Sequence, residues 1–349
     1  MFRNELFGKL AKVNKDDRIL LLTHDDADGA GAEIVLRCMF PDKNIKVVHL
    51  SNGVMSGRVK EALTDAAIAE SFGKVIACDI SCNEADAEYI NSLPDINSRF
   101  VLLDHHLTSQ YINRYSWGVS FGDMLEDSFL VNYYSNGHSS GTSLILDYMY
   151  YCGINFLPDA SCITTENICL WISAYDTWDW KTCFEGNNKF KDENLLFAAY
   201  GNNLYVHRRL TKIGFFASYY DPDDIMLKAE KAKRKEHIES IKDQIKFGTM
   251  DTVLENGRIK IYDIAYIDDS KYVFDVLDYM RDTYPERDLF IVNYGNGVSI
   301  RSDKKDINVA EIVKKFGGGG HKGAGGFKFE KRDIYNLFEK TTGSNLILI

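Results

Sequence analysis

The amino-acid sequence predicts an α/β protein in which a parallel sheet, with helices on both faces, is joined by a helical linker to a smaller α/β domain. Two observations predict this class. Short apolar runs alternate with helical segments through the first half of the chain, as strands buried on both faces of a sheet do. Three of these runs end at an acid or a histidine, and the carboxyl ends of parallel strands form the edge where such sheets bind ligands.

The length of 349 residues predicts two domains, because a single hydrophobic core rarely serves so long a chain. We place the first domain at residues 1–222, a helical linker at residues 223–248 and the second domain at residues 249–349. The linker corresponds to the charged run Asp223–Phe247, and the simplest interpretation of such a run is a solvated connecting helix.

The predicted elements of the first domain alternate between strand and helix. Its strands are expected at Arg18–Thr23, Ile45–Leu50, Lys74–Cys78 and Phe100–Leu103, and its helices at Gly29–Phe40, Val59–Ser71, Ser139–Tyr151 and Ile163–Ala174. Residues 185–222 show no clear periodicity. In the second domain, strands are expected at Arg258–Tyr266, Leu289–Tyr294 and Val298–Arg301, before a glycine-rich segment at Gly317–Phe327.

Composition limits the kinds of partner. No run approaches the roughly 20 apolar residues that a membrane span needs, and the N-terminus lacks the apolar core of a signal peptide, so a cytoplasmic location is expected. The 7 cysteines form no CxxC pair, which favours reduced, buried thiols. The net charge of −10 argues against binding long nucleic acid by phosphate neutralisation alone, but it leaves a small anionic substrate open.

The densest cluster of potential metal ligands follows the first strand and contains His24, Asp25, Asp26 and Asp28. Three carboxylates in one short segment repel each other unless cations neutralise them. Imidazole and carboxylate together suit first-row divalent ions, and a carboxylate-rich set favours manganese or magnesium. The alternative is a polar turn whose aspartates cap the following helix.

Further acids and histidines follow other apolar segments. Asp79 ends one strand, and Asp104, His105 and His106 follow another. Two adjacent histidines in an extended chain cannot point the same way, so one can bind metal while the other faces a substrate. Asp176 follows an apolar helical segment, and by itself it could equally be a capping or turn aspartate.

In this order, the segments HDDADG, CDIS, DHH and YDTW resemble the DHH phosphoesterase superfamily over most of residues 18–180. The resemblance implies two divalent ions, manganese in the first place and magnesium as the alternative, which activate water and neutralise a phosphate. One ion would be bound by His24, Asp26 and Asp79. The second would be bound by Asp28, Asp79, His105 and Asp176.

The same resemblance implies roles for the other two residues of the DHH triplet. Asp104 would orient neighbouring ligands, and His106 would contact the phosphate under attack and stabilise its developing charge.

The glycine-rich segment of the second domain predicts a phosphate site. Backbone N–H groups at Gly319 and Gly320 can approach an anion closely, and Arg301 and His321 add basic side chains. From Arg301 to Lys328, one arginine and six lysines stand against three acids, opposite in sign to the whole chain. A flexible turn is the alternative. The segment resembles the C-terminal substrate-binding domain of many DHH enzymes, in which a GGGH loop and an arginine hold the nucleotide.

The whole pattern is most similar to the nanoRNases, or oligoribonucleases, which implies hydrolysis of short oligoribonucleotides to nucleoside 5′-monophosphates. The implied partner is short single-stranded RNA or a dinucleotide, with no membrane, and the oligomeric state stays open, a homodimer included. Alternatives are hydrolysis of 3′-phosphoadenosine 5′-phosphate, of linear or cyclic dinucleotides or of pyrophosphate, and single-strand exonuclease activity. A non-catalytic nucleotide sensor is disfavoured, because it would be expected to lose at least one of the six ligands.

Overall fold

The computed structural model of the chain describes residues 1–51, 54–65, 71–184, 188–212, 221–253, 259–329 and 346–348. The chain divides into two compact units, Met1–Leu227 and Lys228–Ile349, and the division falls inside α12 (Asp221–Ile241). The domain boundaries expected at residues 222 and 248 stay a prediction. Among the described residues, no helix is both long and apolar enough to span a lipid bilayer.

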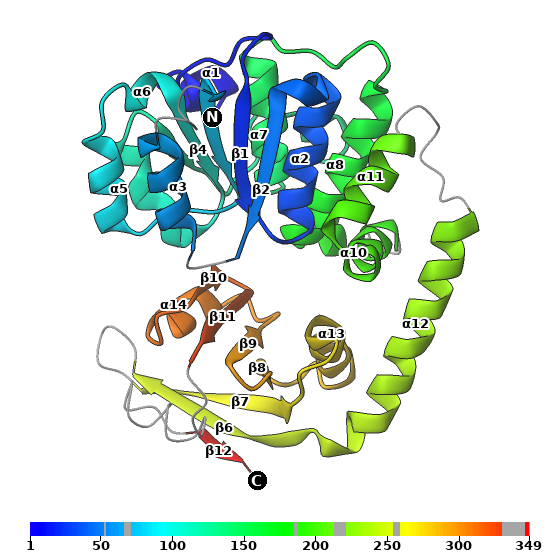
Figure 1. Cartoon of the computed structure of the whole chain (residues 1–349). Helices are drawn as coiled ribbons and strands as arrows, with labels where there is room; N and C mark the ends of the chain where they lie inside the picture. The colour runs from blue at the N-terminus through cyan, green and yellow to red at the C-terminus, as the bar shows by residue number, and fades with distance from the viewer. Residues whose placement is uncertain are drawn as a thin grey trace. The chain divides into compact units, whose positions relative to one another are not determined.

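The first unit is built on a five-stranded sheet of order β2–β1–β3–β4–β5, in which all neighbours are parallel (Figure 1). Its strands are β1 (Ile19–His24), β2 (Ile45–Leu50), β3 (Lys74–Cys78), β4 (Phe100–Asp104) and β5 (Gly118–Ser120). The parallel sheet is thus confirmed, and β1 to β4 coincide closely with the apolar runs that predicted them. The short edge strand β5 was not predicted.

Alternate residues of these strands enter two separate hydrophobic cores. In β1, Ile19 and Leu21 belong to one core, whereas Leu20 and Leu22 belong to the other. Side chains of a strand alternate between its two faces, and both faces must be apolar because helices cover both. This explains why β1, β3 and β4 contain runs of consecutive apolar residues, whereas the edge strand β2 also contains Lys46 and His49.

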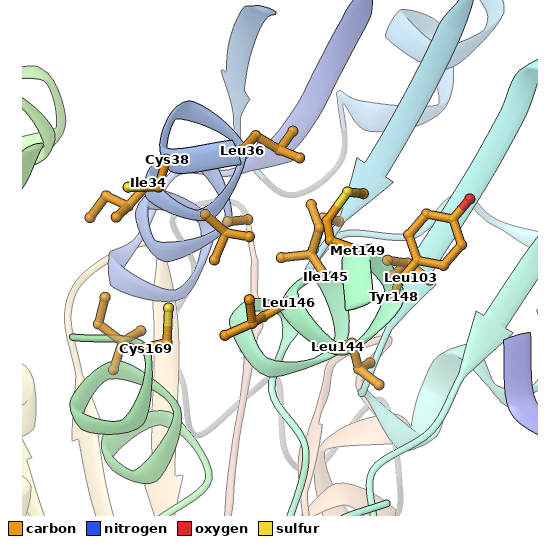
Figure 2. Close-up of a cluster of buried hydrophobic side chains, with 14 of the residues drawn as sticks. Ile34, Leu36, Cys38, Leu103, Leu144, Ile145, Leu146, Tyr148, Met149 and Cys169 are labelled. Carbon is orange, nitrogen blue, oxygen red and sulfur yellow. The ribbon is translucent and has the colours of Figure 1, made fainter. Parts of the chain in front are cut away.

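Helices on both sides of the sheet supply the other half of these cores. One face packs against α2 (Ala27–Met39), α7 (Gly141–Tyr151) and α8 (Cys162–Asp176), and Figure 2 shows side chains of these helices together with Leu103 of β4. The opposite face packs against α3 (Met55–Thr64), α5 (Glu84–Asn91) and α6 (Ile96–Arg99). The predicted helix at Val59–Ser71 therefore begins earlier, and residues 66–70 lie outside the described residues.

The remaining elements of the first unit are shorter or lie toward its end. They are α1 (Arg3–Phe7), α9 (Trp180–Cys183), α10 (Lys189–Tyr200), α11 (Asn202–Lys212) and the 3₁₀ helices Asp42–Asn44, Leu107–Arg114 and Phe129–Asn132. The segment without clear periodicity thus contains two regular helices. All 7 cysteines lie in this unit and are free thiols, as expected, but Cys152 and Cys183 are only half-buried and Cys162 is exposed, whereas burial was expected.

The second unit is built on a seven-stranded sheet of order β10–β11–β9–β8–β7–β6–β12. Its strands are β6 (Lys246–Val253), β7 (Ile259–Asp268), β8 (Leu289–Asn293), β9 (Gly297–Arg301), β10 (Gly319–His321), β11 (Ala324–Lys328) and β12 (Leu346–Leu348). β7 and β8 pair in parallel, and the other described neighbours are antiparallel. One face packs against α13 (Val273–Thr283) and the other against α14 (Val309–Lys314).

The linker is shorter than expected, and the second unit contains a hairpin that was not predicted. The charged helix ends at Ile241 and, after a 3₁₀ turn at Lys242–Gln244, β6 begins at Lys246, whereas the sequence indicated helix through Phe247. The glycine-rich segment is an antiparallel hairpin of β10 and β11, in which Gly319 pairs with Gly326. Glycine has a low strand propensity, so only the neighbouring strand β9 makes this hairpin recognisable. Arg258, where a strand was expected to begin, lies outside the described residues.

Candidate metal centre

The carboxyl end of β1 carries the first two candidate ligands. Nδ1 of His24, the last residue of β1, lies 2.5 Å from Oδ2 of Asp26. The other oxygen of Asp26 accepts a hydrogen bond of 3.0 Å from the N–H of Gly29 and so caps α2. Burial alone would raise the pKa of Asp26, but the hydrogen bond and charge of His24 lower it to about 2. The capping interpretation is therefore correct for one oxygen, while the second oxygen faces the cluster.

Asp28 is held by the start of α7. Its side chain is buried and accepts hydrogen bonds from Ser140 Oγ at 2.7 Å and from the N–H groups of Gly141 at 2.6 Å and Thr142 at 2.9 Å. N–H groups at a helix N-terminus favour a carboxylate. A Cβ at Gly141 would lie 2.4 Å from the Cβ of Asp79, so only glycine allows this approach.

Asp79 lies between the two candidate histidine ligands. Its Oδ1 is 3.2 Å from Nε2 of His105, and its Oδ2 is 3.8 Å from Nδ1 of His24. Its φ of 59° is in the left-handed region, which aspartate tolerates better than most residues. Burial, followed by the charges of Asp26 and Asp28, raises the pKa of Asp79 well above its ordinary value. The ionised Asp79 carboxylate is therefore unfavourable at this position unless a cation binds to it or it takes up a proton.

Asp104 orients both histidines that follow it. Its Oδ1 accepts hydrogen bonds from the N–H of His105 at 2.8 Å and of His106 at 3.3 Å, and it lies 2.8 Å from Nδ1 of His106. Burial opposes the charge of Asp104, but the two imidazoles outweigh it and hold the pKa of this carboxyl well below its usual range. Asp104 thus fixes the geometry of the triplet from behind.

The two histidines differ in charge. Burial, together with the charge of His106, lowers the pKa of His105 to about 4. Burial acts the same way on His106, but the charge and hydrogen bond of Asp104 outweigh it and raise its pKa to about 9. At neutral pH His105 is therefore a neutral imidazole, the form that binds metals, and His106 is a cation.

Asp176 is the last residue of α8 and completes the cluster. Its Oδ2 lies 3.4 Å from Nε2 of His105. Burial, followed by the charges of Asp28 and Asp26, raises its pKa well above the ordinary value. A negative charge at a helix C-terminus opposes the helix dipole, so Asp176 does not serve as a cap. The contact of Asp176 with His105, rather than helix capping, therefore explains why an aspartate occupies this position.

The donor atoms of this unit form sets that fit divalent cations. Ligand atoms lie within 4.8 Å of one another in the sets His24, Asp26 and Asp79, and Asp28, His105 and Asp176. Four carboxylates and two imidazoles are the ligand types that manganese and magnesium accept. The buried Oδ2 atoms of Asp79 and Asp176 have no hydrogen-bond partner among the described residues, which is costly unless a cation neutralises them. The structure brings together all six residues expected as ligands.

The residues expected to bind substrate share one face of the second unit's sheet. Ala324 of β11 pairs with His321 of β10 on one side and with Arg301 of β9 on the other. Directly paired residues point to the same face of a sheet, so His321 and Arg301 flank the small side chain of Ala324. Gly319 and Gly320 precede His321 in β10, and a Cβ at Gly320 would lie 2.3 Å from the carbonyl oxygen of Ala324.

Comparisons with known proteins find one curated relative and several solved structures of similar fold. No protein-family model matches the chain. The chain is similar to oligoribonuclease NrnB of Bacillus subtilis (strain 168), with 24% identity over 323 residues, which are 91% of this chain and 74% of that protein. The solved structure of exonuclease RecJ bound to manganese matches with a TM-score of 0.51 and 13% identity, over 98% of this chain and 92% of that chain. RecJ from Thermus thermophilus in complex with Mn²⁺ matches with a TM-score of 0.49 and 13% identity, over 94% of this chain and 51% of that chain.

The likeness to the oligoribonuclease extends over most of the chain, and the RecJ structure bound to manganese shows that the fold is shared. In this chain the triplet Asp104-His105-His106 lies at the carboxyl end of β4, of which Asp104 is the last residue.

Sequence reasoning missed the residues that hold these ligands in place. Ser140, Gly141 and Thr142 at the start of α7 donate hydrogen bonds to Asp28. In the sequence, Ser139–Thr142 indicated only the beginning of a helix. Another supporting contact lies at β2, where His49 Nε2 is 2.7 Å from Glu33 and His49 Nδ1 donates to the carbonyl oxygen of His24 at 3.1 Å.

A further histidine is oriented near the end of α8. Nδ1 of His138 lies 2.7 Å from Oδ1 of the buried Asp179, and its N–H donates to Oδ2 of the same carboxylate at 2.6 Å. The hydrogen bond and charge of Asp179 raise the pKa of His138, against the effect of burial. Its sequence context gave no signal of this pairing, because Asp179 lies 41 residues away.

Proposed function

We propose that the protein is a two-metal phosphodiesterase that hydrolyses short oligoribonucleotides and releases nucleoside 5′-monophosphates. As a DHH-family phosphodiesterase it acts on oligonucleotides, which is the class that its relatives support. The observation that carries the proposal is the cluster of four carboxylates and two imidazoles at the carboxyl edge of the parallel sheet. Four carboxylates so close together in a buried site would destabilise the folded state unless cations neutralised them.

The proposed ions are two Mn²⁺, with Mg²⁺ as the alternative. His24, Asp26 and Asp79 would hold one, and Asp28, Asp79, His105 and Asp176 would hold the other, so Asp79 would serve both. Such ions, when bound, supply an activated water and neutralise the phosphate. The hydrogen bonds from α7 hold Asp28 in position in advance, so little ordering remains for the bound state.

Asp104 and His106 are proposed to act on the substrate side of the cluster. Asp104 holds the His106 ring by a contact of 2.8 Å and keeps it charged at neutral pH. A cationic imidazole fixed in this way can donate a hydrogen bond to a phosphate oxygen as negative charge develops there. It needs no reorganisation during the reaction.

The second unit is proposed to hold the rest of the substrate. Arg301 and His321 would bind phosphate, assisted by the N–H groups of Gly319 and Gly320. The excess of basic residues in this segment is local, since the chain as a whole has a net charge of −10. A small basic site in an acidic protein suits a short substrate better than a long strand, which needs many phosphate contacts. The name of the relative, an oligoribonuclease, agrees with this choice.

The proposal is tested with 5′-labelled RNA of two to twenty-five nucleotides and Mn²⁺, beside 3′-phosphoadenosine 5′-phosphate, pyrophosphate and cyclic dinucleotides. We expect the shortest RNAs to be cleaved fastest, with 5′-monophosphates as products. Preferential cleavage of long strands, or of one of the other phosphates, would contradict the proposed substrate.

The metal centre is tested separately with Asp79→Asn and His105→Ala. Each is expected to lower kcat by at least about 10³-fold, since both change the site that lowers the barrier. Mn²⁺ should raise the Tm of the wild type, because a ligand that binds only the folded state stabilises it, and this shift should disappear in Asp79→Asn. An unchanged shift together with unchanged activity would rule out the two-metal site.

A further inference from the structure

The second unit contains a pocket that is lined by the proposed phosphate contact Arg301 and by residues to which no role has been given. Its volume is about 590 Å³, within the range of roughly 300–1,000 Å³ for small-molecule sites. Apart from backbone contributed by glycines, its walls include Phe274, Tyr294, Asn296, Ser299 and Arg301. Each of these residues belongs to the second unit, so the pocket is complete within it.

The pocket lies where α13 no longer covers the sheet. In β8, Phe290 and Val292 lie opposite Arg301 and Ser299 of β9 and are covered by the core of α13. On the other side of β9, the partner of Ser299 is Gly326 of β11, which has no side chain. The space over Ser299 and Arg301 therefore stays open beyond the edge of the helix.

One wall of the pocket is aromatic and exposed. Phe274, in the first turn of α13, is 55% exposed, although a phenyl ring is usually buried. The centre of the Arg301 guanidinium lies 5.2 Å from the centroid of this ring, within the range of a cation–π contact. A single exposed aromatic residue is common on protein surfaces. Here, however, the ring lines a pocket together with a buried arginine.

The other walls offer hydrogen bonds at fixed positions. The Arg301 guanidinium donates to Ser299 Oγ at 3.4 Å and to the carbonyl oxygen of Ile300 at 3.2 Å, so its orientation is set. Burial raises the pKa of Tyr294, which keeps its hydroxyl protonated and able to donate. Asn296 adds an amide that can both donate and accept. A flat apolar surface with donors and acceptors around it matches a nucleobase.

We propose that this pocket binds the nucleobase of one nucleotide of the substrate, with Phe274 as the surface on which the base stacks. The inference rests on the proposed function, since it assigns the base of the same substrate whose phosphate Arg301 would hold. Stacking is tolerant of base identity because every base has a π-face. The pocket would therefore add affinity for any nucleotide, and Asn296 is placed to distinguish base edges.

The test compares two ligands that differ only in the base, adenosine 5′-monophosphate and ribose 5-phosphate. Their binding to the full chain is measured by calorimetry in EDTA, so that no turnover occurs. We expect the wild type to bind adenosine 5′-monophosphate more tightly. In Phe274→Ala this ligand should bind about 5- to 100-fold more weakly, the range for loss of one base–aromatic stack, while ribose 5-phosphate is unaffected.

Two further variants make the result specific. Phe274→Trp should keep the preference for the nucleotide, because indole also stacks on bases. Ile261→Ala removes another exposed apolar side chain, 64% exposed in β7 of the same unit, and should change neither affinity.

Equal affinity of the wild type for the two ligands, or an equal loss of both in Phe274→Ala, would overturn the inference. These outcomes are independent of hydrolysis. A wild type that prefers the nucleotide but cleaves no oligonucleotide with Mn²⁺ would instead contradict the proposed function and leave the base pocket in place.

Discussion

His105 and His106 show at the residue scale how position decides chemistry. Their ring centroids are 4.3 Å apart, yet one imidazole is neutral and the other charged at neutral pH. His105 is buried beside a cation, whereas His106 has its Nδ1 on Asp104. A charged group needs a partner in a buried environment, and only one of the two rings has Asp104 directly on a ring nitrogen. The sequence identifies the two histidines, but their different charges depend on the contact of the Asp104 carboxylate with Nδ1 of His106.

Asp147 of α7 is a buried acid away from the metal centre and allows a test of the same physics. Its Oδ1 accepts a hydrogen bond of 3.0 Å from the N–H of Phe129. Burial, against the hydrogen bonds of Ser128 and Phe129, raises its pKa from 3.8 to about 7. Because the folded pKa lies above the unfolded one, the folded state binds a proton that the unfolded chain has already released.

We therefore expect Asp147→Asn to become more stable relative to wild type as pH rises. The contribution of the protonated carboxyl is fully present below about pH 4 and is lost progressively up to about pH 7, at about 1.4 kcal/mol per pH unit. The variant keeps the acceptor for Phe129 and removes the charge. Urea unfolding of both proteins at pH 5, 6, 7 and 8 measures the difference, and parallel pH profiles would show that Asp147 does not titrate in this range.

The start of α7 is the element on which the metal centre depends most. Its first N–H groups bind Asp28, and the absence of a side chain at Gly141 lets the helix approach Asp79. The helix N-terminus contributes partial positive charge to a site that carries four acids. The positions of Asp28 and Asp79 at the strand ends thus depend on α7, which comes from a distant part of the sequence.

Gly141→Ala is expected to damage the centre without removing any ligand. A Cβ there would lie 2.4 Å from the Cβ of Asp79 and 2.9 Å from Oδ2 of Asp28, so α7 must shift away. We expect a loss of about 1–3 kcal/mol in stability, typical of overpacking, and at least about tenfold weaker Mn²⁺ binding. Calorimetric unfolding and metal titration measure the two effects.

Gly57 in α3 is the matched control. A Cβ at this helical glycine would meet nothing within 4 Å. Gly57→Ala should therefore leave metal binding unchanged and stabilise the helix by roughly 0.5–1 kcal/mol. Equal behaviour of the two variants would show that the space around Gly141 is not limiting.

At the scale of the whole molecule, charge limits the length of substrate that can be held. The chain has a net charge of −10, and its proposed contacts with phosphate are few. For single strands, the logarithm of affinity falls with the logarithm of salt concentration at a slope of about −0.7 per neutralised phosphate. A site for a short substrate neutralises the same small number of phosphates whatever the length of the RNA.

We expect the logarithm of 1/KM to fall with the logarithm of salt concentration at a shallow slope of about −1, equal for RNAs of two and twelve nucleotides. KM for each is measured across a range of KCl concentrations at constant Mn²⁺. A slope that steepens with RNA length would indicate an extended cationic groove and would favour the single-strand exonuclease alternative. The oligomeric state and a cytoplasmic location stay predictions.

Most of the parallel sheet, and the proximity of the six residues expected as ligands, could be predicted from the sequence for two physical reasons. Strands buried on both faces contain consecutive apolar residues, so β1, β3 and β4 can be recognised as short apolar runs. Parallel strands end at one edge, so His24, Asp79 and the DHH triplet must lie near one another. By contrast, β10 and β11 consist largely of glycine and are strands only because β9 pairs with them.

The sequence by itself determined the fold class, the candidate ligands and the family that they resemble, because local patterns of apolar and acidic residues carry that information. Only the tertiary structure decided how those residues are supported. The contacts of α7 with Asp28 and the pocket beside Phe274 join segments that are separated in the chain. Such contacts depend on packing between elements, to which no local pattern corresponds.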